Sequence, residues 1–132
     1  MDKPLIVVNF KTYETAMGDS ALTLAKAMDN FTDRDFRMIA VVSAFDLSTI
    51  SNSVSSVEVW SQHLDPVGKG SHTGWLEPDL ALHHGAVGTI INHAEHKVTI
   101  EHVEKLMAML PIDFPICACA ADVDEALSLI HI

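Results

Sequence analysis

Five short apolar segments recur along the chain, and each is separated from the next by a stretch that carries turn or helix signals. Their hydrophobicity is nearly continuous instead of alternating, which is typical of β-strands that are covered on both faces. Strands of this kind belong to a parallel sheet wrapped by helices. The pattern therefore predicts five such strands, over residues 5–10, 38–44, 57–62, 86–91 and 114–120.

Helix signals fill the stretches between the predicted strands. Pro78 stands just inside the start of one helix and Gly85 just past its end, which is the asymmetry expected of a short helix. Thr99 is a candidate N-cap for a later helix that Pro111 stops. Apolar side chains at helical spacing predict two buried faces, formed by Leu22, Ala25 and Met28 in residues 19–30, and by Ile100, Val103, Leu106 and Leu110.

Alternating strands and helices leave two architectures open within a single domain. One is an open, doubly wound sheet of the flavodoxin type, which five βα units in 132 residues would complete. The other is part of a closed (β/α)₈ barrel, which normally needs roughly 200 to 250 residues. Length favours the first architecture, so the polar residues at the strand ends must decide.

Composition narrows the possible partners. Eight Lys and Arg residues against eighteen Asp and Glu give a net charge of −10, which repels phosphate backbones and anionic membrane surfaces, so we expect neither nucleic acid nor a membrane as partner. Apolar runs stay short of a membrane span and the N-terminus does not resemble a signal peptide, which favours the cytoplasm. In that compartment Cys117 and Cys119 are predicted to be buried, unpaired core residues.

An amide and an ammonium follow the first predicted strand. Alternation places Asn9 and Lys11 on the same side, opposite Val8 and Phe10. The carboxyl ends of parallel strands are where ligands bind in both architectures, so this pair suits an anionic substrate such as a phosphate or a carboxylate. The alternative is an ordinary surface lysine at the start of a loop.

A polar cluster ends the fourth predicted strand, in "AVGTIINHAEHK". His93 and Glu95 allow three interpretations, which are metal binding, proton chemistry and a solvated strand end. Neither residue belongs to an H-E-x-x-H pattern that would place two imidazoles on one helical face, which disfavours a metal. The loop after the third strand has its glycines at 68, 70 and 74 and fits no nucleotide-binding motif. That loop is predicted to be a lid, a subunit contact or a flexible connection.

Taken in order, three segments resemble the triosephosphate isomerase family, particularly its short archaeal form: Asn9-Phe10-Lys11, "SQHLDPVGKGSHTG" and "GTIINHAEHK". The resemblance runs from Pro4 to about Ala126. It implies a (β/α)₈ barrel, of which residues 1–126 would be about the first five βα units and the N-terminal part of a single domain. It also implies a homo-oligomer, dimer or tetramer, in which the loop 65–75 reaches a neighbouring subunit.

The same resemblance implies an isomerase of glycolysis and gluconeogenesis that interconverts dihydroxyacetone phosphate and glyceraldehyde 3-phosphate through an enediol, without cofactor or metal. Asn9 and Lys11 would bind the small phosphorylated three-carbon substrate. His93 would be the electrophile that polarises the substrate carbonyl in its neutral form, as is well known for triosephosphate isomerase itself. Glu95 would hold Lys11 and would not be the catalytic base.

Several departures from the family pattern matter. Ala94 replaces a serine, and His96-Lys97 replaces a more usual polar or arginine-bearing continuation. The family's catalytic glutamate and lid follow the sixth strand, and its phosphate loops follow the seventh and eighth, so we expect this chain alone to be inactive. The last residues, "LSLIHI" at 127–132, resemble the translation of a sequencing-library transposon end, and we expect a non-native tail there.

Two rival interpretations remain at this point. One is a flavodoxin-like domain that is non-enzymatic or binds a small ligand, and the other is a natural α/β half-barrel, also non-enzymatic, whose exposed strand edges serve self-association. Flavodoxin-like receivers carry an acidic pair after the first strand, where this chain has Asn9 and Lys11. That difference disfavours the first rival.

Overall fold

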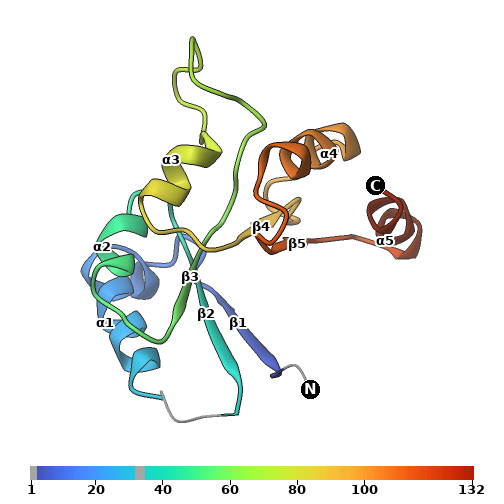
Figure 1. Cartoon of the computed structure of the whole chain (residues 1–132). Coiled ribbons are helices and arrows are strands. Elements are labelled where there is room, and N and C mark those ends of the chain that lie inside the picture. Colours follow the sequence, from blue (N-terminus) through green and yellow to red (C-terminus); the bar gives the residue numbers. More distant parts are fainter. Residues whose placement is uncertain (1–2, 32–34) are drawn as a thin grey trace.

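Five parallel strands form one sheet in the order β1-β2-β3-β4-β5 (Figure 1). The structure is a computed structural model that describes residues 3–31 and 35–132. Every predicted strand is present, although each is shorter than its apolar segment. The strands are β1 (Leu5–Asn9), β2 (Arg37–Val42), β3 (Glu58–Ser61), β4 (Thr89–Ile91) and β5 (Ile116–Ala118).

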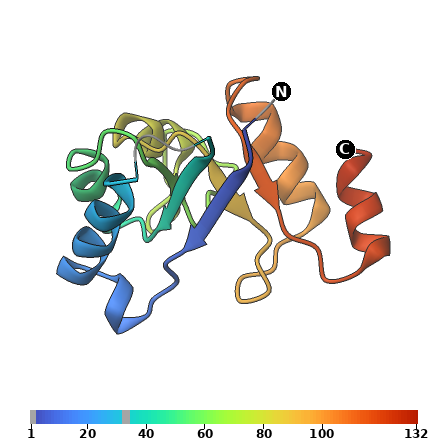
Figure 2. The ribbon, with the colours of Figure 1, turned by 90° about the horizontal axis from the view of Figure 1, so that it is seen from below.

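The strand order decides between the two architectures. A doubly wound sheet reverses its strand order at a switch point, which places the first strand inside the sheet. Here each strand pairs with the one before it in the chain, as it does in a (β/α)₈ barrel. The sheet curls accordingly and the helices lie around its outer side (Figure 2). The fold is therefore an incomplete (β/α)₈ barrel, as predicted from the resemblance, and the flavodoxin-like alternative is wrong.

Helices connect the strands, and three of them begin at a residue whose side chain caps the helix. Thr99 Oγ1 accepts a hydrogen bond from the His102 N–H at 3.1 Å, which confirms the predicted N-cap. Gly85 has φ +97°, a left-handed conformation that suits the predicted helix end before it. The helical elements are η1 (Glu14–Ala16), α1 (Asp19–Asp29), α2 (Leu47–Ser51), α3 (Pro78–His83), α4 (Ile100–Met109) and α5 (Val123–Ile130).

Two apolar clusters hold the sheet. The larger lies between the sheet and the helices and includes Phe10, Ile50, Ile91 and Leu106, each at most 1% exposed. The smaller lies on the opposite, inner face of the sheet and consists of Ile39, Val41, Trp60 and Ile90. Burial of both faces explains why the central strands read as continuous apolar runs.

The inner face is not covered throughout, and two predictions fail there. Leu5 and Val7 of β1 are 49% and 42% exposed, although both faces of each strand were predicted to be covered. Cys117 of β5 is also exposed instead of buried, and Cys119 is half-buried. The physical reason is the same at both places, because β1 and β5 are the edge strands of the sheet and each has a neighbour on one side only.

The C-terminal helix extends into the segment that was predicted to be a tail. α5 runs to Ile130, and Leu129 packs against the larger cluster, while Ile130 stays 72% exposed.

Among the described residues, no helix combines the length and apolar character that crossing a membrane requires.

Candidate functional site

A cavity of about 900 Å³ opens at the carboxyl ends of the strands. Side chains at the ends of β1, β3 and β4 and in the loops that follow line it, and all four residues predicted from the sequence are among them. These are Asn9, Lys11, His93 and Glu95. Because the first two lie more than eighty positions before the others in the chain, only the parallel arrangement of the strands brings them together.

The turn after β1 is held in a defined conformation. Lys11 has φ +51°, in the left-handed region that residues other than glycine seldom adopt. Asn9 Oδ1 accepts a hydrogen bond from the Lys11 N–H at 3.0 Å, and Gln62 Nε2 donates to the Lys11 carbonyl at 2.9 Å. The two amide side chains therefore stabilise the backbone that presents the lysine to the cavity.

Lys11 and Glu95 form an ion pair across the mouth of the cavity. Lys11 Nζ donates to Glu95 Oε1 at 3.1 Å. The hydrogen bond to Glu95, with a further contribution from Tyr13, raises the pKa of Lys11 above its ordinary value. Lys11 is thus an ammonium ion at neutral pH, placed where an anionic ligand would meet it.

His93 is held by the backbone of its own loop. Its Nδ1 lies 3.1 Å from the Glu95 nitrogen and accepts that N–H. Nδ1 also lies 3.5 Å from Glu95 Oε2, and a neutral ring that accepts the backbone N–H at Nδ1 carries its proton on Nε2. The ring is half-buried and lines the cavity, where an Nε2–H can donate to an oxygen of a ligand.

Asn92 shapes the same loop, although it was not predicted to be a site residue. It is 1% exposed and has φ +61°. Its Nδ2 donates to the Cys119 carbonyl at 2.9 Å, and its Oδ1 accepts from the Val98 N–H at 2.9 Å. Asn tolerates the left-handed conformation better than most residues. An Asn placed directly after an apolar strand was therefore the feature of the sequence from which this role of Asn92 could have been predicted.

A charged pair ties α5 to this loop. Glu125 accepts hydrogen bonds from Lys97 Nζ, from the Ala121 N–H and from Asn92 Nδ2. These donors, with Lys97 first, lower the pKa of Glu125 to about 2. Neither Glu125 nor Gln62 was predicted as a site residue, because each acts through partners that lie far from it in the chain.

The arrangement can bind an anion and polarise a carbonyl group. Lys11 supplies the positive charge, and His93 Nε2 offers a hydrogen-bond donor beside it. The carboxylates among the cavity-lining residues are Glu95 and Asp65, and both are engaged, Glu95 by Lys11 and Asp65 by His63. Neither His93 nor Glu95 belongs to a cluster of three potential metal ligands within the described part of the chain.

Comparisons with known proteins agree with the barrel fold. The sequence profile described as "Triosephosphate isomerase" matches residues 4–126. The triosephosphate isomerase of Archaeoglobus fulgidus is 38% identical over 101 residues, which are 76% of this chain and 45% of that protein. Those of Methanothermus fervidus and Metallosphaera sedula are each 35% identical, over 83% and 89% of this chain and 50% and 53% of their own lengths. The chain spans about half the length of the curated relatives it matches.

Proposed function

Because the chain belongs to the triosephosphate isomerase family, we propose that it supplies the first five βα units of a (β/α)₈ enzyme that interconverts dihydroxyacetone phosphate and glyceraldehyde 3-phosphate. The observation that carries the proposal is the position of His93, a half-buried imidazole beside the Lys11–Glu95 ion pair in a single cavity. An enediol mechanism needs a group that stabilises negative charge on oxygen without giving up its proton too early.

Each residue then has a defined task. Lys11 and Asn9 bind the phosphorylated substrate, and the ammonium of Lys11 offsets its negative charge. Glu95 keeps Lys11 in place through the 3.1 Å ion pair. His93 donates its Nε2–H to the substrate carbonyl, and this bond strengthens as the oxygen gains charge in the enediolate.

The proton itself needs another group. Isomerisation removes a proton from one carbon and returns it to the neighbouring carbon, which requires a base within hydrogen-bond reach of both. Glu95 is committed to Lys11, and Asp65 to His63 and the Leu76 N–H. We therefore expect residues 1–132 alone to be inactive and the base to come from the family's loop after the sixth strand.

The loop 65–75 supports an oligomeric parent protein, dimer or tetramer. It extends away from the strands between β3 and α3 (Figure 1), and Trp75 at its end is 55% exposed. An exposed tryptophan on a projecting loop suits contact with a second subunit.

We propose that this enzyme acts in the cytoplasm, where free thiols such as Cys117 and Cys119 persist.

Fragment complementation tests the proposal. Purified residues 1–132 are assayed with a coupled isomerase reaction, alone and after mixing with a separately expressed C-terminal half of an archaeal family member. We expect no turnover from the chain alone and measurable turnover from the mixture.

In the mixture, His93→Gln should lower kcat by about a hundredfold and change KM much less, because the lost contact is strongest in the transition state. His83→Gln, which alters an exposed histidine of α3, is the matched control and should leave turnover unchanged. Activity of the chain alone that disappears with Glu95→Gln would overturn the assignment of the base to another segment. A mixture of folded halves with equal turnover for His93→Gln would overturn the role of His93.

A further inference from the structure

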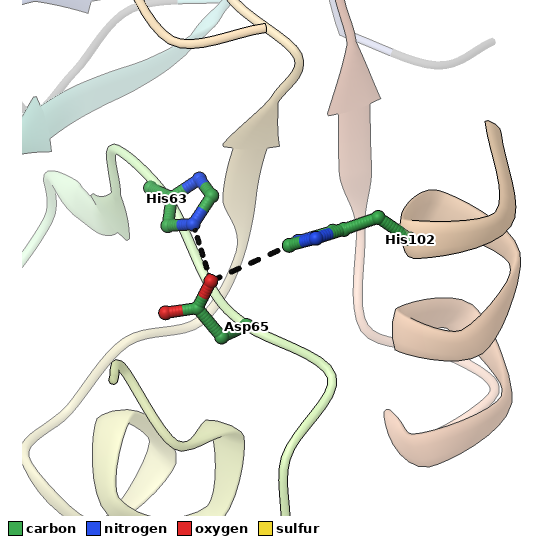
Figure 3. Close-up of side chains that lie close together, drawn as sticks. All are labelled: His63, Asp65 and His102. Carbon is green, nitrogen blue, oxygen red and sulfur yellow. Dashed lines mark hydrogen bonds and ion pairs between the residues drawn. The ribbon is translucent and has the colours of Figure 1, made fainter. Parts of the chain in front are cut away.

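Two imidazoles and a carboxylate converge at the wall of the cavity, and none of the three is a residue to which substrate binding or carbonyl polarisation is assigned above (Figure 3). His63 and Asp65 lie in the loop after β3, and His102 lies in the first turn of α4. Asp65 Oδ1 stands between the two rings, 2.8 Å from His63 Nε2 and 4.0 Å from His102 Nε2. All three potential ligand atoms lie within 4.8 Å of one another.

The cluster is largely removed from solvent. His63 and Asp65 are each 8% exposed, and the side chain of His102 is 15% exposed. A buried carboxylate is rare in proteins unless it is paired or coordinates a metal. Burial also lowers the pKa of His63, against the raising effect of the Asp65 carboxylate.

Backbone hydrogen bonds to Leu76 orient the Asp65 carboxylate. Asp65 Oδ2 accepts the Leu76 N–H at 2.8 Å, and the Asp65 N–H donates to the Leu76 carbonyl at 2.9 Å. These two bonds fix the side chain and leave Oδ1 directed at the imidazoles (Figure 3). Outer hydrogen bonds of this kind orient ligands at metal centres.

We propose that His63, Asp65 and His102 form a binding site for a divalent transition-metal ion of the zinc class, which links the loop after β3 to α4. Two imidazoles with one carboxylate are a donor set that zinc accepts, with water as the fourth ligand. Imidazole ligands disfavour magnesium and calcium, which prefer oxygen. The site contains none of the residues that we assign to substrate binding or to carbonyl polarisation.

The ligand atoms lie within 4.8 Å of one another and must move to the spacing of a zinc site. Ligand atoms of a tetrahedral zinc site lie about 3.3 Å apart when each bond is about 2.0 Å. The 2.8 Å contact of Asp65 with His63 must therefore lengthen, and the 4.0 Å contact with His102 must shorten. His63 Nε2 donates to Asp65 Oδ1 and His102 Nε2 donates to the Leu64 carbonyl, so in both rings the proton must move to Nδ1 when the metal binds. That change of tautomer leaves each ring neutral.

Cobalt binding tests the site without reference to catalysis. Purified residues 1–132, stripped of metal with a chelator, are titrated with Co²⁺ at neutral pH, and the visible bands of four-coordinate cobalt are recorded. We expect saturation at one equivalent and full displacement by Zn²⁺. His102→Gln retains a donor for the Leu64 carbonyl, and Asp65→Asn removes the charged ligand. Each should weaken Co²⁺ binding at least about tenfold, since loss of an outer partner alone costs that much.

His83→Gln is the matched control, because His83 is an exposed histidine beside His84 on α3 and would reveal adventitious binding there. It should titrate like the parent chain, and far-UV circular dichroism should match for every variant. No bands at one equivalent, or equal affinity in folded His102→Gln, would overturn the proposal. Loss of the bands in His83→Gln would assign the metal to α3 and would also overturn it.

Discussion

At the scale of single residues, side chains hold backbone conformations that no periodicity reveals. Asn9 and Lys11 were predicted to lie together from strand alternation, and both line the cavity. The left-handed φ of Lys11 and of Asn92 could not be predicted, because each depends on partners elsewhere in the chain. A sequence pattern thus identifies the polar residues of a strand end, while the fold decides how they are oriented.

The protonation of His93 is the first testable consequence at this scale. Because its Nδ1 accepts the Glu95 N–H, we expect a neutral ring with the proton on Nε2 at neutral pH. Two-bond ¹H–¹⁵N correlation spectra distinguish the two neutral tautomers from imidazolium. The exposed His83 serves as the reference ring. A proton on Nδ1 of His93, or a charged ring, would contradict the proposed electrophile.

At the scale of elements, the strands and the ends of the longer helices were predictable, whereas some buried faces were not. In α1 the buried residues are Ala21, Ala25 and Met28, while Leu22 is only half-buried. The buried face of α1 therefore begins one position earlier than predicted, because the small Ala21 is buried where the larger Leu22 was expected to be. α2 was not predicted, since five residues are too few to show a period.

Gly88 permits a close approach of chain segments at β4. A Cβ at this position would lie 2.3 Å from the Trp60 ring, which is buried in the inner cluster. We expect Gly88→Ala to reduce the free energy of unfolding by about 2 kcal/mol through overpacking. Urea denaturation monitored by fluorescence measures the change. Gly68→Ala is the control, because no heavy atom lies within 4 Å of a Cβ there; equal effects would refute the explanation.

The Glu125 contacts make the docking of α5 dependent on pH. The pKa of Glu125 in the folded chain is about 2, which is lower than its ordinary value of 4.5. The contribution of Glu125 to the free energy of unfolding is therefore complete above about pH 4.5 and is lost as the pH falls towards 2. We expect Glu125→Gln to flatten this part of the stability profile, measured as urea midpoints at a series of pH values. Glu104→Gln, an exposed change on α4, should keep the slope of the parent chain. An unchanged slope in Glu125→Gln would contradict the assignment.

At the scale of the whole molecule, the architecture was predicted from motifs and not from length. Chain length favoured a doubly wound sheet, while three segments in family order indicated the barrel. The strand order confirms the barrel. The cluster of His63, Asp65 and His102 was missed because its third member lies 37 positions beyond the second and joins it only through packing of α4.

Removal of residues 127–132 tests the predicted tail. Leu127 and Ile130 are 48% and 72% exposed, so their deletion removes apolar surface from solvent contact. We expect the soluble yield to stay unchanged or to rise, with the far-UV spectrum of the remaining elements retained. Leu129→Ala in the intact chain is the control for the one side chain of the segment that packs against the larger cluster. A large loss of folded signal on deletion would show that the segment belongs to the core.

The pairing of each strand with its predecessor also bears on how the chain reaches its fold. β2 needs only β1 in order to pair, and β5 needs only β4. Pairing between successive strands closes shorter loops than the pairings in a sheet whose first strand lies in the middle. Shorter loops favour faster folding. During synthesis the sheet can therefore grow from its N-terminal edge, one βα unit at a time, as the chain leaves the ribosome.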